Sequence, residues 1–151
     1  PHTAGENGSA LLDQIKVFSK EFDRVVAWRC NVADEEACAR AEVLMPSLRR
    51  MYNRTLLHVG LPIGQDDYMI TSRFHPHLLA ARTGIDGSYL VQSDFYDSKH
   101  RSVAELGSRF HLYDGRLGLK RNPTLSAMPR LDNERVAAKR AVGAYILRLL
   151  G

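Results

Sequence analysis

The chain has 151 residues, of which 44% are hydrophobic and 25% are charged, a composition typical of a globular protein with one core. No apolar run approaches the roughly 18 residues of a membrane-spanning helix, which excludes a transmembrane protein. The formal net charge is +4 and it is unevenly distributed. Residues 1–97 contain 10 Lys and Arg against 13 Asp and Glu, and residues 98–151 contain 11 against 4. A basic C-terminal half of this kind attracts anionic ligands. Lysine and arginine side chains that only form the solvent-exposed face of a helix give the same pattern.

The N-terminal third of the sequence predicts helices. Residues 1–8 form a polar, glycine-containing lead-in to a single domain over residues 9–151. Ser9 can cap a helix whose apolar residues recur at spacings of three and four as far as Val26, and which is broken at Asn31. Asp34 starts a second helix over residues 34–44. Pro46 divides that pattern from a third helix over residues 47–59, so the start of the chain predicts a helical hairpin.

The middle of the chain changes to an alternating pattern, which is typical of strands. Five strands are predicted, over residues 67–74, 77–83, 88–96, 108–113 and 116–120. Asp114-Gly115 predicts a hairpin between the last two, and Ile85-Asp86-Gly87 predicts a second turn. The interpretation is an α+β fold with a four- to five-stranded antiparallel sheet.

A final amphipathic helix is expected to begin at Asp132 and to pack on this sheet. Its predicted apolar face contains Val136, Ala137, Ala141, Val142, Tyr145, Ile146, Leu149 and Leu150.

The two cysteines lie on either side of one predicted junction between helices. Cys30 closes the first helical pattern and Cys38 lies just inside the second, so a fold-back between them brings the two within reach of a disulfide. A disulfide would place the protein in an oxidising compartment, secreted or periplasmic. Two buried thiols in a cytoplasmic protein are the alternative.

The segment "SRFHPH", residues 72–77, is the strongest candidate for chemistry. In an extended segment His75 and His77 share one face, which is a sound start for a metal site. A third ligand is required, for which His111 is the first candidate. Two histidines at a sheet edge, where Pro76 is tolerated, are the simpler interpretation, and no metal or other cofactor is predicted.

A second candidate site is the polar stretch "DFYDSKHRS". His100 lies between two cations, and Asp94 or Asp97 could work with it in acid–base catalysis. The sequence of this stretch is equally typical of a charged loop that is exposed to solvent. No glycine-rich phosphate loop or nucleophile elbow accompanies it.

The basic C-terminal half supplies candidate ligand-binding residues. Cations are interleaved with aromatic residues there, which favours binding of an anionic ligand or a protein partner, and nucleic acid is a further possibility. The candidates are Lys99, Arg101, Arg109, Arg116, Lys120 and Arg121.

The functional hypothesis is an exported binding module that recognises an anionic or protein partner through its basic half. One alternative is a histidine-dependent hydrolase of a phosphate- or sugar-containing substrate, with or without a metal, and the other is a structural subunit of a larger assembly. The catalytic candidates for the hydrolase are His75, His77, His100 and His111 with Asp94 or Asp97. The sequence does not indicate an oligomeric state.

Overall fold

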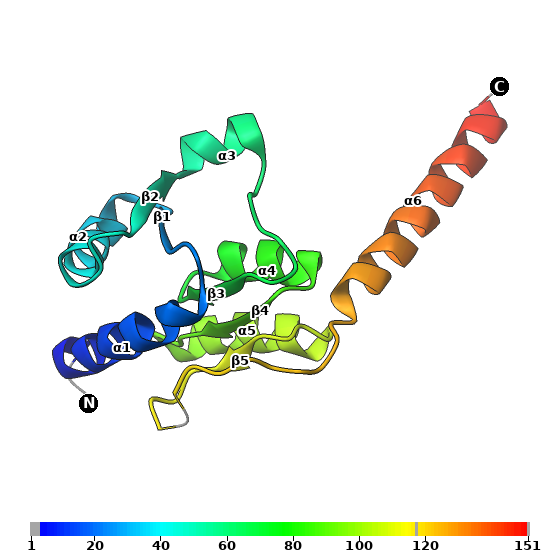
Figure 1. The fold of residues 1–151 in the computed structure, drawn as a ribbon. Helices are drawn as coiled ribbons and strands as arrows, with labels where there is room; N and C mark the ends of the chain where they lie inside the picture. The colour runs from blue at the N-terminus through cyan, green and yellow to red at the C-terminus, as the bar shows by residue number, and fades with distance from the viewer. Residues whose placement is uncertain (1–3, 117, 151) are drawn as a thin grey trace. The chain divides into compact units, whose positions relative to one another are not determined.

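The computed structural model describes residues 4–116 and 118–150 (Figure 1). The contacts divide the chain into two compact units. Unit 1 comprises Pro1–Pro62 with Asp114–Leu119, and unit 2 comprises Ile63–Tyr113 with Lys120–Gly151. No helix in the described part of the chain is both long enough and apolar enough to span a membrane.

Unit 1 is built around a two-stranded parallel sheet. Its elements, in chain order, are α1 (Ala4–Phe18), the 3-10 turn η1 (Ser19–Glu21), β1 (Val26–Arg29), the 3-10 turn η2 (Val32–Asp34), α2 (Glu35–Leu44), β2 (Arg49–Tyr52) and α3 (Asn53–Val59). Val26 of β1 pairs with Arg49 of β2. Buried Cys38 and Ala41 lie on α2, which connects the strands.

The predicted helix over residues 34–44 is confirmed as α2, but both of its predicted neighbours are wrong in extent. Helix α1 begins at Ala4, within the predicted lead-in, of which residues 1–3 lie outside the described residues. It ends at Phe18, where the 3-10 turn η1 follows, and Val26 at the end of the predicted helix is the first residue of strand β1, which suits a β-branched side chain. The predicted third helix is also divided, into β2 and α3.

Unit 2 contains a three-stranded parallel sheet in the order β3-β4-β5. Strand β3 (Tyr68–Thr71) leads through α4 (Phe74–Thr83) to β4 (Asp86–Tyr89), and β4 leads through α5 (Asp94–Glu105) to β5 (His111–Leu112). Tyr68 pairs with Asp86, and Ser88 pairs with His111. Because each helix carries the chain back to the starting edge of the sheet, the next strand runs parallel to the one before it.

The predicted antiparallel sheet is therefore wrong, and the error begins at residue 74. The segment interpreted as a strand over residues 77–83 is helix α4. Pro76 is the third residue of α4, where no N–H is needed within the helix, and Gly84 follows its last residue in the left-handed conformation, at φ 83°. A proline in the first turn and a glycine just beyond the end are typical of a helix.

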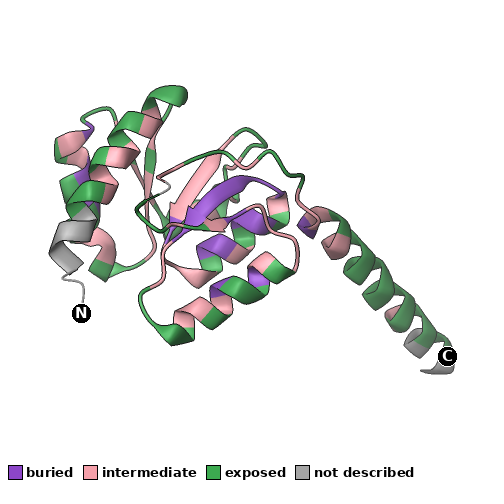
Figure 2. Cartoon of the chain, turned by 90° about the horizontal axis from the view of Figure 1, so that it is seen from below, coloured by how far each residue is buried: buried purple, intermediate pink, exposed green. Residues whose placement is uncertain are grey.

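The predicted turn at Ile85-Asp86-Gly87 is also wrong, because these residues enter the most buried strand. All four residues of β4 are buried (Figure 2). The Asp86 carboxylate accepts hydrogen bonds from the backbone N–H groups of Gly87 and Asn122 and lies 3.7 Å from the Arg109 guanidinium. In this strand Asp86 therefore makes a buried polar contact, and Gly87 allows neighbouring groups to pack closely.

The Asp114-Gly115 turn forms without the predicted hairpin. The Arg116 N–H donates to Asp114 Oδ1 at 2.9 Å, which closes the turn. Strand β5 has only two residues and pairs in parallel with β4, and no strand occurs among residues 116 and 118–120. The turn chemistry was read correctly, but it does not determine how the flanking segments pair.

Helix α6 (Met128–Leu150) is the last element of unit 2, and its contacts with the other elements of that unit lie near its start among the side chains that the structure describes, so the predicted packing on the sheet is wrong. Arg82 of α4 donates to Asp132 at 2.8 Å, and Met128 is buried. Residues 133–142 are exposed, as the green ribbon in Figure 2 shows. Periodicity indicated an apolar side but not what covers it. The side chains of Ile146, Leu149 and Leu150 lie outside the described residues.

The predicted disulfide is absent, because Cys30 and Cys38 are both free thiols. Cys30 follows a strand instead of ending a helix, so the helical fold-back that was to join the pair does not exist. The Cys30 thiol lies 3.8 Å from the carbonyl of Trp28. The disulfide argument for export is thereby lost, and the predicted compartment stays untested.

We expect a thiol assay of the denatured chain, without reductant, to give two thiols per molecule. In the native protein Cys30 should react first, because Cys38 is buried and burial raises the pKa of its thiol. A Cys30→Ser variant, which removes the half-exposed thiol, should retain only the slow reaction. Fewer than two thiols in the denatured, unreduced chain would contradict the fold around β1 and α2.

Candidate functional site

Two histidines stack in the core of unit 2, between its sheet and its helices. His77 of α4 and His100 of α5 are each 0% exposed. Their ring centroids are 5.1 Å apart, and both rings also stack on Tyr89 of β4. The Phe110 ring lies 4.5 Å from that of His77. Because both histidines reach the same strand, α4 and α5 cover the same face of the sheet.

A directional chain of hydrogen bonds passes through these two histidines. Ser108 Oγ accepts from the Phe110 N–H at 3.1 Å and lies 3.4 Å from His77 Nε2, to which its hydroxyl can donate. The Ser72 backbone beside His100 favours a proton on the His100 nitrogen that faces away from His77, so we assign the His77 proton to Nδ1, which donates to His100 Nδ1 at 2.8 Å. The His100 proton is then on Nε2. This buried atom lacks a hydrogen bond of good geometry within the described chain, although the Ser72 backbone is near enough to favour the charged imidazole.

Burial keeps both imidazoles neutral. Desolvation, with a smaller contribution from neighbouring His100, lowers the pKa of His77 to about 3. Desolvation also lowers the pKa of His100, against the opposing effects of the Ser72 backbone and Asp97. A fully buried, weakly basic imidazole neither reaches a substrate nor accepts its proton near neutral pH. The pair therefore joins α4 to α5 and supports the segment at Ser72.

The structure separates the two histidines of the segment that was expected to act together. His75 is the second residue of α4 and exposed, whereas His77 is buried. In a helix, residues two apart point in widely different directions, so the shared face predicted for an extended segment is wrong. His111 lies on β5, where its Nε2 is 3.0 Å from Ser88 Oγ. No group of three potential ligands able to hold a metal ion occurs among the described residues.

The carboxyl ends of β3 and β4 lie next to the amino ends of α4 and α5. Ser72 and Arg73 follow β3, and Gln92 and Ser93 lie between β4 and α5. Thr71 Oγ1 accepts from the Arg73 N–H at 2.9 Å, and Gln92 Nε2 donates to Ser72 Oγ at 3.4 Å. These contacts join the two connecting segments. In open sheets with parallel strands, ligands bind at this edge.

The two helices differ electrostatically at their amino ends. Asp94 and Asp97 occupy the first turn of α5, and Asp97 is paired with Arg101 at 2.8 Å. The first turn of α4 has no acidic residue, and Arg73 immediately precedes it. The first N–H groups of a helix have no partner within the helix and carry partial positive charge, here those of Phe74 and His75. The amino end of α4 therefore favours an anion.

The six predicted ligand-binding cations are divided between the two units. Arg116 belongs to unit 1, whereas the other five belong to unit 2. Lys99 Nζ lies 4.2 Å from the centroid of the Phe95 ring. Arg109 donates to the Asn122 carbonyl, and Arg121 donates to the Asp66 carbonyl at 3.2 Å. Lys120 is exposed, and its carbonyl accepts from Tyr68. Several of these cations have structural contacts that periodicity could not reveal.

A polar chain on the strands includes Ser88, which is 0% exposed. Tyr68 donates its hydroxyl proton to the Lys120 carbonyl at 3.0 Å, so at the 2.5 Å contact it must accept from Ser88 Oγ. Ser88 then accepts from His111 Nε2, which assigns the proton of His111 to that atom. Desolvation raises the pKa of Tyr68 to about 12. The hydroxyl of Ser88 is thus enclosed and holds strands together.

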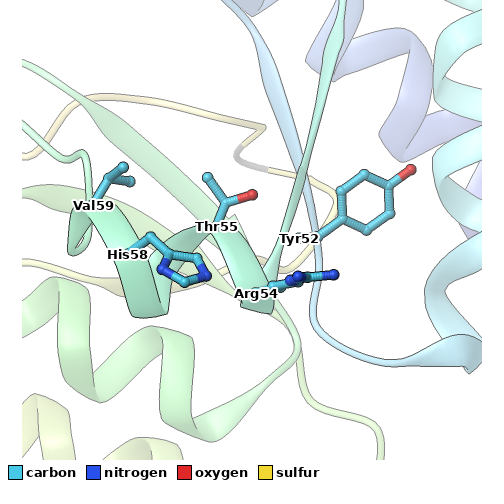
Figure 3. A pocket seen from close by; sticks show the side chains of 5 residues that line it. All are labelled: Tyr52, Arg54, Thr55, His58 and Val59. Carbon is cyan, nitrogen blue, oxygen red and sulfur yellow. The ribbon is translucent and has the colours of Figure 1, made fainter.

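Unit 1 has a shallow hollow of its own along β2 and α3 (Figure 3). It is lined by Tyr52, Arg54, Thr55, His58 and Val59, all of them exposed. Arg54 and His58 are four residues apart on α3, so they lie on one side of the helix. The hollow has no buried polar group among these five residues, which makes it a weaker candidate than the amino end of α4.

Comparison with known proteins gives no assignment: no protein-family model, curated protein or solved structure matches the chain. The functional argument therefore depends on the chain's own residues. Of those, sequence reasoning found His77 and His100 but missed Arg73 and Ser108. The available signal for Arg73 was its place just before a segment with an early proline and a terminal glycine, the signs of a helix start.

Proposed function

We propose that unit 2 is a binding module for an anionic group, which it holds at the amino end of α4. The observation that carries the proposal is the combination of a basic residue, Arg73, with a helix start that lacks acidic residues, at the carboxyl edge of a parallel sheet. Phosphate and carboxylate groups fit the two N–H donors of Phe74 and His75. The proposal keeps the anionic partner predicted from the sequence and changes the residues that bind it.

Buried His100 bears on the proposal only through the fold. Its ring stacks on that of His77, and it lies near the backbone of Ser72, directly before Arg73, so it helps to hold the segment that leads into α4. The histidine-dependent hydrolase is not favoured, because His77 and His100 are enclosed and His111 is bonded to Ser88.

The test is a titration of the full chain with inorganic phosphate, pyrophosphate and acetate, observed through the backbone amide resonances of Phe74 and His75. We expect pyrophosphate to shift these resonances saturably and Arg73→Gln to weaken the binding about tenfold or more, because a charge-assisted hydrogen bond is lost. Added salt should compete.

The matched control is Arg82→Gln, at the opposite end of the same helix, where the guanidinium pairs with Asp132. This change should leave the affinity for pyrophosphate within about twofold. If both substitutions weakened pyrophosphate binding equally, the effect would depend on the net charge of the protein and not on the position of Arg73. Absence of any saturable shift with all three anions would refute the proposed site.

A further inference from the structure

Three aromatic rings of unit 2 surround the ammonium group of one lysine. Lys99 Nζ lies 4.2 Å from the ring centroid of Phe95 and 5.8 Å from that of Tyr96, both on its own helix α5. It also lies 5.5 Å from the ring centroid of Phe74, the first residue of α4. The faces of aromatic rings attract a cation without neutralising it. Among the described residues Lys99 forms no salt bridge, so its charge is available to an anion.

This lysine brings a second cation to the anion site at the amino end of α4. Phe74, whose N–H is one of the two donors of that site, directly follows Arg73. Lys99 reaches the ring of Phe74 from α5, so two cations from different elements lie next to the same residue. A guanidinium binds one phosphate group through paired hydrogen bonds, and an ammonium binds another as a point charge. The pair therefore matches a ligand with two adjacent phosphate groups.

The ring of Phe95 offers the same ligand an apolar surface. It is 64% exposed, although Lys99 lies against it. Phe95 is four residues before Lys99 on α5, so the ring and the ammonium group share one side of the helix. A phenylalanine ring has no hydrogen-bonding group, and flat nucleobases cover such a ring by stacking on it. The arrangement thus places a stacking surface beside two cations.

We propose that the anion held at the amino end of α4 is the diphosphate group of a nucleotide, whose base stacks on Phe95 and whose second phosphate contacts Lys99. This inference rests on the proposed function and adds the class of ligand to it. A sugar phosphate without a base has no flat aromatic surface, so it leaves the ring of Phe95 unused.

The test is a titration of the full chain with ADP, AMP and ribose 5-phosphate, observed through the backbone amide resonances of Phe74 and His75. AMP differs from ribose 5-phosphate only in its base, and ADP has one phosphate more than AMP. We expect AMP to bind about tenfold more tightly than ribose 5-phosphate, because one base is stacked. ADP should bind about tenfold more tightly than AMP, because a charge-assisted hydrogen bond is added.

Two substitutions separate the base contact from the phosphate contact. Phe95→Leu keeps an apolar side chain but removes the flat ring, so it should abolish most of the preference for AMP over ribose 5-phosphate. Lys99→Gln should instead abolish most of the preference for ADP over AMP. The matched control is Tyr145→Leu, which removes a ring that is 63% exposed from α6 of the same unit. It should leave all three affinities within about twofold.

The outcomes distinguish a wrong ligand from a wrong site. If pyrophosphate shifts the two resonances saturably but AMP binds no more tightly than ribose 5-phosphate, the anion site stands and the nucleotide is refuted. A Phe95→Leu protein that keeps the preference for AMP also overturns the stacking. If ADP binds no more tightly than AMP, or if its advantage survives Lys99→Gln, the diphosphate contact is overturned. If none of the phosphate compounds shifts the resonances, both the site and the ligand class are refuted.

Discussion

Replacing Gly87 with alanine is expected to destabilise unit 2 by about 3 kcal/mol or more. A Cβ at this position would lie closer than 3.0 Å to the Met69 carbonyl oxygen of β3 and to the ring of Phe110. The carbonyl belongs to the paired strand, so it cannot move without breaking the sheet. Overpacking in a core generally costs 1–3 kcal/mol, and a backbone obstacle raises that figure. Urea unfolding measures the loss.

Gly143→Ala is the matched control, because it adds the same methyl group where no atom lies within 4 Å. Gly143 is in α6, and alanine is favoured over glycine in a helix by about 1 kcal/mol. The control should leave the unfolding of the sheet unchanged and raise the helix content. A Gly87→Ala protein as stable as the parent would show that β3 and β4 do not pair in the register described.

Gly87 also explains why the fold class was only partly predictable. Asp86-Gly87 and Asp114-Gly115 are the same dipeptide, and both read as turns. One is a turn closed by its own aspartate, and the other lies in a buried strand where the glycine makes room for Phe110. The difference depends on residues far away in the sequence, which local pattern does not contain.

The candidate site was predictable in its residue types more than in its geometry. The local stretches "SRFHPH" and "DFYDSKHRS" indicate His77 and His100 as members of two separate sites. Their contact joins α4 to α5 across 23 positions in the sequence, and assigning α4 as a strand misplaces it. Pro76 fits the edge of a strand as well as the first turn of a helix, and the structure places it in the first turn of α4. Assigning α4 correctly would have given the crossover from β3 to β4, and with it the parallel sheet and the edge where Arg73 lies.

Unit 2 is expected to lose stability as the pH falls below about 6.5, well before most carboxylates titrate. The pKa of His77 is lowered to about 3 by burial and by His100, so the folded protein keeps this imidazole neutral while the unfolded chain binds a proton near pH 6.5. The unfolded state then holds more protons, and the stability decreases with falling pH. The slope is about 1.4 kcal/mol per pH unit for each such histidine.

Between pH 6.5 and 5 the expected loss is therefore about 2 kcal/mol from His77 alone, and more with His100, whose pKa is also lowered by burial. Urea unfolding at intervals of half a pH unit measures it. The physical cause is specific to each ring. Protonation of His77 places a charge between Tyr89 and Phe110 and removes the Nε2 acceptor that faces Ser108. Protonation of His100 removes the acceptor in the 2.8 Å contact between the two Nδ1 atoms. None of these consequences can be relieved without opening the α4–α5 layer.

The decisive comparison is the double variant His77→Phe, His100→Phe, which retains ring stacking on Tyr89 and removes both titrating groups. Its stability should be nearly independent of pH from 6.5 to 5. His75→Phe, on the exposed side of the same helix turn, should follow the parent curve. If the double variant and the parent lose stability in parallel, the acid sensitivity originates elsewhere and the two imidazoles are not the neutral, stacked pair described. If only the double variant is insensitive to pH, the energy that joins α4 to α5, and with them the segment that carries Arg73, depends on keeping those two rings uncharged.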